Sequence, residues 1–370
     1  ALPLDGDPER ESHPQARYEA FEPVWVFKLL GFKKEIYRPL AQEFEKRGWR
    51  LGTLTAPEPG DDAFFFLYDW RRSNQESVRE LHRQLTALAA ARGADDQAVD
   101  LICQSNAARI CRWLAKYGSL SLAEAERGAK PEPAPYRLRK LVLVGASNSG
   151  TLRVLEQLHR GRRHIRAVGR KLSPEALFTN RALFEDLPLD RGDLFVGPDG
   201  EPLDVDLSDP DTWVELGLSI FSPDAQRRIE KSGRRDIFGS FEDQVAYVAR
   251  WLDAGRRIAA LLERDSPLFG DVRYYLLENA SQPTIDRALL VKGKGRWRTF
   301  FMGDTEVDDT PRLERVAVVA GDGHASISSQ RDLSPQEQAA KVRSVAVEGG
   351  HFEMLIADAA LDALFGFLAD

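Results

Sequence analysis

The first part of the chain alternates between short apolar runs and amphipathic helical patterns, and this alternation allows few architectures. Each apolar run has the length of a buried strand, and apolar residues at helical spacing follow it. The predicted strands cover 24–30, 63–70, 98–103 and 138–146, and the predicted helices cover 35–47, 75–92, 106–117 and a segment ending near 160. Strands joined by helices pair in parallel, and the helices cover both faces of the sheet. The sequence therefore predicts an α/β fold with a mainly parallel sheet.

The pattern changes between about 170 and 268, where prolines divide the chain into short pieces before one long helical pattern over 241–263. Strand patterns then resume, and a last helical pattern closes the chain. The later strands are predicted at 272–277, 288–291, 298–302 and 315–320, and the last helix at 357–368. We therefore expect a core formed by 1–168 and 269–370, interrupted by a cap or lid insertion over 169–268.

Composition excludes several classes of protein. A net charge of −7 argues against nucleic acid as a partner, because nucleic-acid binders present a basic face. The two cysteines, Cys103 and Cys111, cannot form a disulfide scaffold. Together with the scattered histidines they form no ligand cluster, so neither a metal nor a cofactor is expected. The first residues are polar and lack a signal-peptide core, which favours a cytoplasmic protein; export with the signal already removed is the alternative.

One segment has the layout of a nucleophile elbow, in which a strand enters a serine and a helix starts directly after it. The predicted strand at 98–103 leads into Ser105, and Asn106 opens the next helix. So tight a turn needs small residues two positions before and after the serine, and Cys103 and Ala107 are small. The backbone N–H of Asn106 would then point at a developing oxyanion. The alternative is a serine that only caps a helix.

A second serine competes with the first. Ser147 lies in Gly145–Gly150, which follows a predicted strand and fits the pattern G-x-S-x-S. The alternative for this segment is a turn that caps a helix and lines the pocket.

A serine nucleophile needs a base, and the base needs an acid to orient it. In hydrolases built on this layout the chain order is serine, acid, histidine. His351 lies before the final predicted helix, and Asp322 directly follows a predicted strand. Asp304 is the second candidate for the acid. The alternative is that Asp322 is only a turn residue and His351 only a helix cap.

The residues Tyr68-Asp69-Trp70-Arg71 resemble the YDWR signature of the lecithin:cholesterol acyltransferase family of α/β-hydrolases. The segment Asp204–Leu216, with Trp213, resembles bacterial-type members of that family. The resemblance covers roughly 23–165 and 270–368. It implies that Ser105 is the nucleophile, that Asp322 in the family's G-D-G segment is the acid and that His351 is the base. Gly145–Gly150 takes the place of the family's G-T-P-x-x-G segment, which makes Ser147 a pocket or structural residue.

The chain departs from this pattern at the oxyanion site. The loop after the first strand usually reads H-G or P-G, whereas here Leu29 or Leu30 has to supply the backbone N–H that acts with Asn106. The elbow has cysteine and alanine where glycines are usual. Phe32, Trp70 and Trp213 are the residues we expect to contact the substrate.

The expected function is that of a serine esterase, lipase or O-acyltransferase. The resemblance implies a small-molecule or lipid ester as substrate, with transient contact to a membrane surface. Aromatic and aliphatic residues of the insertion, Phe178 to Phe221, either line an apolar pocket or form the insertion's own core. The competing hypothesis is an α/β-hydrolase relative that binds a ligand or partner without catalysis. A dinucleotide-binding fold is excluded, because no G-x-G-x-x-G follows an early strand.

Overall fold

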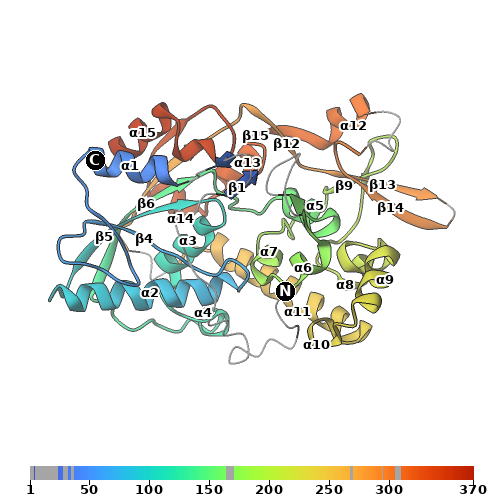
Figure 1. The fold of residues 1–370 in the computed structure, drawn as a ribbon, viewed down its shortest axis with the longest axis horizontal. Helices are drawn as coiled ribbons and strands as arrows, with labels where there is room; N and C mark the ends of the chain where they lie inside the picture. Colours follow the sequence, from blue (N-terminus) through green and yellow to red (C-terminus); the bar gives the residue numbers. More distant parts are fainter. Residues whose placement is uncertain are drawn as a thin grey trace. The chain divides into compact units, whose positions relative to one another are not determined.

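The computed structural model describes Leu4 and residues 24–27, 32–34, 37–163, 171–266, 270–293, 295–304 and 310–370. The chain divides into two compact units (Figure 1). The sheet unit comprises Gln15–Asn148, Leu261–Ala280 and Gln330–Asp370, and the insertion unit comprises Ala1–Pro14, Ser149–Ala260 and Ser281–Ser329. The three-part division into 1–168, 169–268 and 269–370 stays a prediction.

The sheet unit is built on four parallel strands in the order β16-β11-β6-β5. These strands are β5 (Gln97–Gln104), β6 (Tyr136–Val144), β11 (Arg273–Glu278) and β16 (Lys341–Ala346). Two small sheets pair β1 (Val24–Phe27) with β2 (Phe32–Lys34) and β3 (Leu51–Thr53) with β4 (Ala63–Phe65). The helices are α1 (Arg38–Lys46), α2 (Asn74–Ala91), α3 (Ala107–Tyr117), α4 (Leu122–Glu126), α14 (Pro335–Ala339), η3 (Glu353–Leu355) and α15 (Asp358–Ala369).

Alternation along the strands buries both faces of this sheet. On β6, Val142 and Val144 point to the face covered by α1 and α15, while Leu141 and Leu143 point to the face covered by α3. All four side chains are fully or almost fully buried. A parallel sheet needs this covering on both faces, which is why its strands read as continuous apolar runs. The loops that follow the four strands lie at one edge of the sheet, where open α/β sheets bind their ligands.

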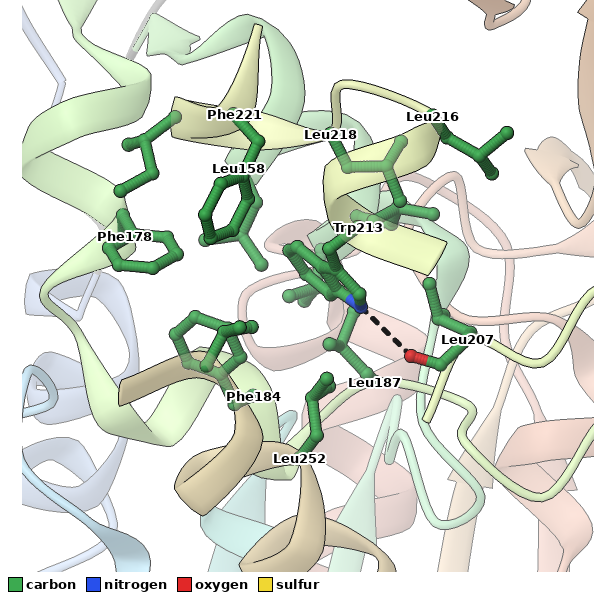
Figure 2. Close-up of a cluster of buried hydrophobic side chains, with 14 of the residues drawn as sticks. Leu158, Phe178, Phe184, Leu187, Leu207, Trp213, Leu216, Leu218, Phe221 and Leu252 are labelled. Atoms are coloured by element: carbon green, nitrogen blue, oxygen red, sulfur yellow. Dashed lines mark hydrogen bonds between the residues drawn. The ribbon is translucent and has the colours of Figure 1, made fainter. Parts of the chain in front are cut away.

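The insertion unit packs short helices and small sheets around an aromatic core (Figure 2). Its helices are α5 (Leu152–Arg160), α6 (Pro174–Phe178), α7 (Arg181–Glu185), α8 (Pro210–Glu215), η2 (Ser219–Phe221), α9 (Pro223–Ser232), α10 (Arg235–Phe238) and α12 (Thr310–Ala317). Its strands are β7 (Arg162–Arg163), β8 (Lys171–Leu172), β9 (Phe195–Val196), β10 (Pro202–Leu203), β12 (Gln282–Ile285), β13 (Ala288–Gly293), β14 (Arg296–Phe300) and β15 (Val318–Gly321). Two helices, α11 (Phe241–Glu263) and α13 (Ile327–Arg331), have residues in both units.

The aromatic and aliphatic residues between Phe178 and Phe221 form the core of the insertion unit. Phe178 and Phe184 meet edge to face with ring centroids 5.5 Å apart, and Phe184 lies 5.6 Å from Trp213. The indole N–H of Trp213 donates to the carbonyl of Leu207 at 2.9 Å, so the ring is both buried and satisfied. The sequence allowed these residues either to line an apolar pocket or to form the insertion's own core. The contacts support the second interpretation.

The predicted bounds of two strands are wrong. The strand predicted at 63–70 ends at Phe65. The strand predicted at 315–320 is helical as far as Ala317, and β15 starts only at Val318, where pairing with β12 begins. The strands predicted at 288–291 and 298–302 are confirmed as β13 and β14. They form the antiparallel hairpin β13–β14 because the two residues between Gly293 and Arg296 are too short a connection for a parallel crossover. None of the helices in the described part of the chain is long and apolar enough to cross a membrane.

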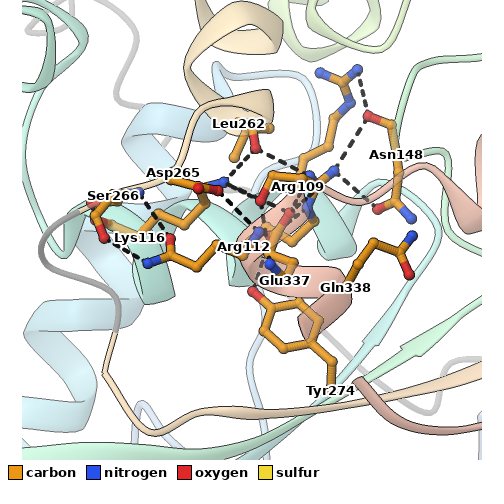
Figure 3. Close-up of polar contacts among 12 residues, drawn as sticks. Arg109, Arg112, Lys116, Asn148, Leu262, Asp265, Ser266, Tyr274, Glu337 and Gln338 are labelled. Carbon is orange, nitrogen blue, oxygen red and sulfur yellow. Dashed lines mark hydrogen bonds and ion pairs between the residues drawn. The ribbon is translucent and has the colours of Figure 1, made fainter. Parts of the chain in front are cut away.

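Helix α3 carries a row of buried cations that ties the sheet unit together (Figure 3). Arg109, Arg112 and Lys116 are each at most 1% exposed. Arg112 forms a two-point ion pair with Glu337, at 2.8 and 2.6 Å, and Tyr274 donates to the same carboxylate at 3.0 Å. Bidentate pairing of this kind is among the stronger polar contacts in proteins. The row therefore fixes α3 against α14 and the sheet.

Backbone carbonyls balance the remaining positive charge of α3. Arg112 and Lys116 both donate to the carbonyl of Leu262, in the last turn of α11, where the helix dipole is negative. Arg109 donates to the carbonyls of Ser147 and Asn148, both at 3.2 Å, in the loop after β6. Burial lowers the pKa of Lys116 to about 8, although the nearby Glu337 carboxylate opposes this shift. The same contacts thus fix the loop beside the end of β5.

Replacing Glu337 by glutamine should lower the free energy of unfolding by about 3–5 kcal/mol, because it leaves Arg112 and Lys116 buried without a carboxylate. Urea denaturation at neutral pH, followed by tryptophan fluorescence, measures this change. The matched control is Glu58→Gln, which removes the exposed pair with Arg50 (3.1 Å) and should cost about 1 kcal/mol or less. Equal losses of unfolding free energy in the two variants would contradict the assignment of Glu337 as the carboxylate that stabilises Arg112 and Lys116.

Candidate active site

Ser105 lies in a strained turn between β5 and α3. Its φ angle is +56°, a left-handed value that non-glycine residues rarely adopt; within the described ranges Ser219, at +52°, is the other non-glycine example. The Ser105 N–H donates to the carbonyl of Val144 at 3.0 Å, and its carbonyl accepts from Ala108 at 2.9 Å. The serine thus continues the pairing of β5 with β6 and also begins the first turn of α3. A serine held in this strained strand–turn–helix geometry has the form of a nucleophile elbow.

Asn106 is the N-cap of α3, so its backbone N–H lies outside the helix's own hydrogen-bond ladder. Its side-chain amide forms a reciprocal pair with the amide of Asn74, with N–O distances of 2.8 and 2.9 Å. Asn74 is the first residue of α2, directly after the loop that contains Trp70. The pair joins the starts of α2 and α3.

The geometry at Ser147 differs from that at Ser105. The turn after β6 takes its positive φ at Gly145 (+52°), and Ser147 is buried in a longer loop that reaches α5 only at Leu152. The Ser147 carbonyl accepts from Arg109. These features belong to a structural loop held by α3, and they lack the immediate strand–serine–helix succession of an elbow.

His351 lies in the loop after β16 and is 7% exposed. The loop is held by its backbone: Val347 donates to the carbonyl of Glu278 at 2.8 Å, and the Asn279 amide donates to the carbonyl of Gly349. Gln104, the residue before Ser105, donates to the carbonyl of His351 at 3.1 Å. This last bond links the histidine backbone to the strand that ends at Ser105, within one unit.

Asp322 belongs to the insertion unit, directly after β15, and is 1% exposed. Its Oδ1 accepts from the N–H groups of His324 and Ala325, both at 2.8 Å, and Gly323 donates to the Thr284 hydroxyl at 2.8 Å. The carboxylate therefore has a fixed orientation. Asp304, the second candidate, forms an ion pair with Arg160 and accepts from the Phe301 N–H at 2.9 Å. The pairing of His351 with Asp322 stays a prediction.

The remaining predicted site residues have varied surroundings. Leu29 and Leu30 lie outside the described residues, and Phe32 begins β2. Trp70 is 41% exposed, in the loop between β4 and α2, and Trp213 is fully buried in the insertion core. Substrate contact by these residues stays a prediction. In the described part of the chain, no group of three or more His, Cys, Asp or Glu side chains is arranged to hold a metal ion.

Sequence reasoning missed one feature of the elbow. Cys103 and Cys111 form a disulfide, with Cα atoms 6.5 Å apart. The interpretation that two cysteines cannot build a disulfide scaffold did not consider this local bridge. A signal was present in the spacing, because Cys103 points from β5 to the face covered by α3, and Cys111 lies on α3.

Ser105→Gly should raise the free energy of unfolding by about 1 kcal/mol. The left-handed conformation costs a residue with a Cβ atom about 1–3 kcal/mol, and glycine avoids this cost. The backbone entropy that glycine adds to the unfolded chain offsets part of the gain. Ser105→Ala, which removes the hydroxyl but keeps the Cβ atom, should bring no such gain. Urea denaturation of both variants measures the difference, and equal stabilities would show that Ser105 is not strained.

No protein-family model matches the chain, and no curated protein matches it. A chain of the Tle4–Tli4 complex is similar in structure, with a TM-score of 0.53 and 12% identity over 84% of this chain and 68% of that one. The Vlm2 thioesterase domain with a bound dodecadepsipeptide has a TM-score of 0.25 and 13% identity over 79% and 74% of the two chains. At such identities the first similarity concerns the fold alone. With its parallel sheet and the elbow after β5, the chain has an α/β-hydrolase fold.

Proposed function

We propose that this chain is a serine hydrolase or acyltransferase that acts on carboxylic esters through an acyl-enzyme. The observation that carries the proposal is the left-handed Ser105 between β5 and α3. A strained conformation persists only where the surroundings enforce it, and it is common at catalytic positions. Here the strain places a hydroxyl at the carboxyl edge of a parallel sheet, where ligands of such sheets bind.

In the proposed reaction His351 accepts the Ser105 hydroxyl proton while Oγ attacks the ester carbonyl carbon. The negative charge moves to the carbonyl oxygen, where the Asn106 N–H and a second N–H from Leu29 or Leu30 stabilise it. Each such donor contributes about 3–4 kcal/mol in other enzymes. The intermediate then expels the alcohol, which takes the proton from His351. Water or a second alcohol attacks the acyl-enzyme by the same steps in reverse.

Gln104 and Asp322 support the role of His351 in different ways. The Gln104 amide holds the backbone of His351 from the residue next to the nucleophile. Asp322, with one oxygen held by two backbone N–H groups, is proposed to fix the imidazole tautomer and to stabilise the imidazolium through its carboxylate. Asp304 is a weaker candidate, because its carboxylate already pairs with Arg160.

The finer assignment is to the lecithin:cholesterol acyltransferase-like group, and it rests on the YDWR resemblance at Tyr68–Arg71. It brings with it a lipid ester as substrate, a reaction without a cofactor and transient contact with a membrane surface. Trp70, which is 41% exposed in the YDWR loop, is the aromatic residue that we propose contacts such a substrate.

A fluorophosphonate probe should phosphonylate the Ser105 hydroxyl and displace fluoride, because only an activated serine reacts at a useful rate. Intact mass after labelling, followed by peptide mapping, identifies the residue. His351→Ala should abolish the adduct, and Asp322→Asn should slow its formation by about 10²–10⁴-fold, since the imidazole loses its orienting charge.

Two matched variants serve as controls for this labelling. Ser147→Ala and Asp304→Asn should label at rates close to that of the unmodified chain. An adduct on Ser147 would place the elbow elsewhere. A folded chain without any adduct would favour the competing hypothesis, a ligand-binding or partner-binding protein that has lost catalysis.

Gln104→Met should lower kcat for a short-chain p-nitrophenyl ester about tenfold and leave KM within about twofold, because the loss of one hydrogen bond loosens the base but not the substrate. Steady-state kinetics measures both constants. The control is Gln338→Met, which removes a similar amide-to-carbonyl bond, to Arg331 at 2.9 Å, on the surface. An unchanged kcat in Gln104→Met would remove Gln104 from the positioning of His351.

A further inference from the structure

The two cysteines of the chain lie on the two arms of the elbow. Cys103 is the second residue before Ser105, on β5, and Cys111 is on α3, six residues after the serine. Their disulfide joins positions separated by eight residues, and both side chains are buried, at 1% and 5% exposure. The bridge therefore closes a small covalent loop with Ser105 inside it.

The loop closed by the disulfide contains the strained Ser105, so the bridge acts on the conformation of the serine as well as on stability. A left-handed non-glycine residue relaxes when its neighbours allow it. The contacts of the turn itself are hydrogen bonds: Ser105 to Val144, and Asn106 to Asn74. The strand arm and the helix arm of the elbow meet at Ser105, so a relaxation of its φ angle changes the angle between them unless neighbouring dihedral angles compensate. The disulfide ties the arms directly and opposes this change.

We propose that the Cys103–Cys111 disulfide is a positioning device for Ser105, and that the reaction depends on its being oxidised. This inference rests on the proposed function. Cys103 and Cys111 act through the serine and do not touch the substrate. In the reduced chain the two thiols no longer restrain the arms, and Ser105 leaves the geometry in which His351 can take its proton.

The redox step is a thiol–disulfide exchange with a small dithiol. One thiolate of the dithiol attacks a protein sulfur and breaks the S–S bond; its second thiol then resolves the mixed disulfide. The chain gains two thiols, and the dithiol is oxidised to a cyclic disulfide. Disulfides persist mainly in oxidising compartments. The bridge therefore argues against the cytoplasmic location expected from the sequence, and that location stays a prediction.

The test compares three forms of the full chain: oxidised, reduced with dithiothreitol, and the double variant Cys103→Ala/Cys111→Ala. For each form, the rate of fluorophosphonate labelling and the kcat and KM for a p-nitrophenyl ester are measured well below the unfolding temperature. Circular dichroism gives the folded fraction. We expect kcat and the labelling rate per folded molecule to fall at least tenfold in the reduced form and the double variant, with KM within about twofold.

Reoxidation of the reduced disulfide provides the decisive comparison. Reoxidation of the reduced chain with oxidised glutathione should restore the rate, whereas the double variant should respond to neither dithiothreitol nor glutathione. Equal rates per folded molecule in all three forms would overturn the proposal and leave the proposed function intact. A loss that follows the unfolded fraction would assign the bridge a structural role only and would also overturn it. If the oxidised chain itself fails to label, the proposed function fails first.

Discussion

Helix α3 has to bury three cations, and much of the sheet unit is arranged to meet that requirement. Glu337 supplies a carboxylate to Arg112 and Lys116, and the last turn of α11 supplies carbonyl oxygens to the same pair. A buried charge without partners costs several kcal/mol, so the segments that offer these oxygens are held in place as firmly as the helix. Because α3 starts directly after Ser105, the same contacts hold the second arm of the elbow.

The proposed nucleophile, Ser105, and the proposed base, His351, belong to the sheet unit, whereas the proposed acid, Asp322, belongs to the insertion unit. Ser105 is held by β6, and Gln104 carries that constraint to the backbone of His351, so movement of the strand end displaces both residues together. Asp322 is fixed by the turn after β15, in the insertion unit. Under the proposed mechanism, proton transfer from Ser105 to His351 therefore depends on contacts within the sheet unit.

The bounds of strands and helices could be predicted best where strands are buried on both faces of the sheet. Strands β5 and β6 and the helices after them lie within about two residues of their predicted bounds, because a strand buried on both faces and an amphipathic helix leave unambiguous patterns. The strand–serine–helix succession at Ser105 was predictable for the same reason. The antiparallel pairing of β13 with β14 could not be predicted, because an apolar run does not reveal its pairing partner. The ion cluster could not be predicted at all, since charged residues on a helix usually face solvent.

The elbow of this chain differs in sequence from the usual pattern, and a disulfide is bonded at one of the changed positions. Elbows of this kind usually carry glycines two positions from the serine, which give the crowded turn room. Here Cys103 and Ala107 occupy those positions, and Cys103 is bonded to Cys111 on the helix. A glycine lowers the cost of the strained turn but also leaves the unfolded chain more freedom. A disulfide across the turn restricts that freedom and leaves the strain in place. If the bridge positions Ser105 as proposed, the chain holds its serine by covalent restraint, where elbows with glycines rely on the absence of a side chain.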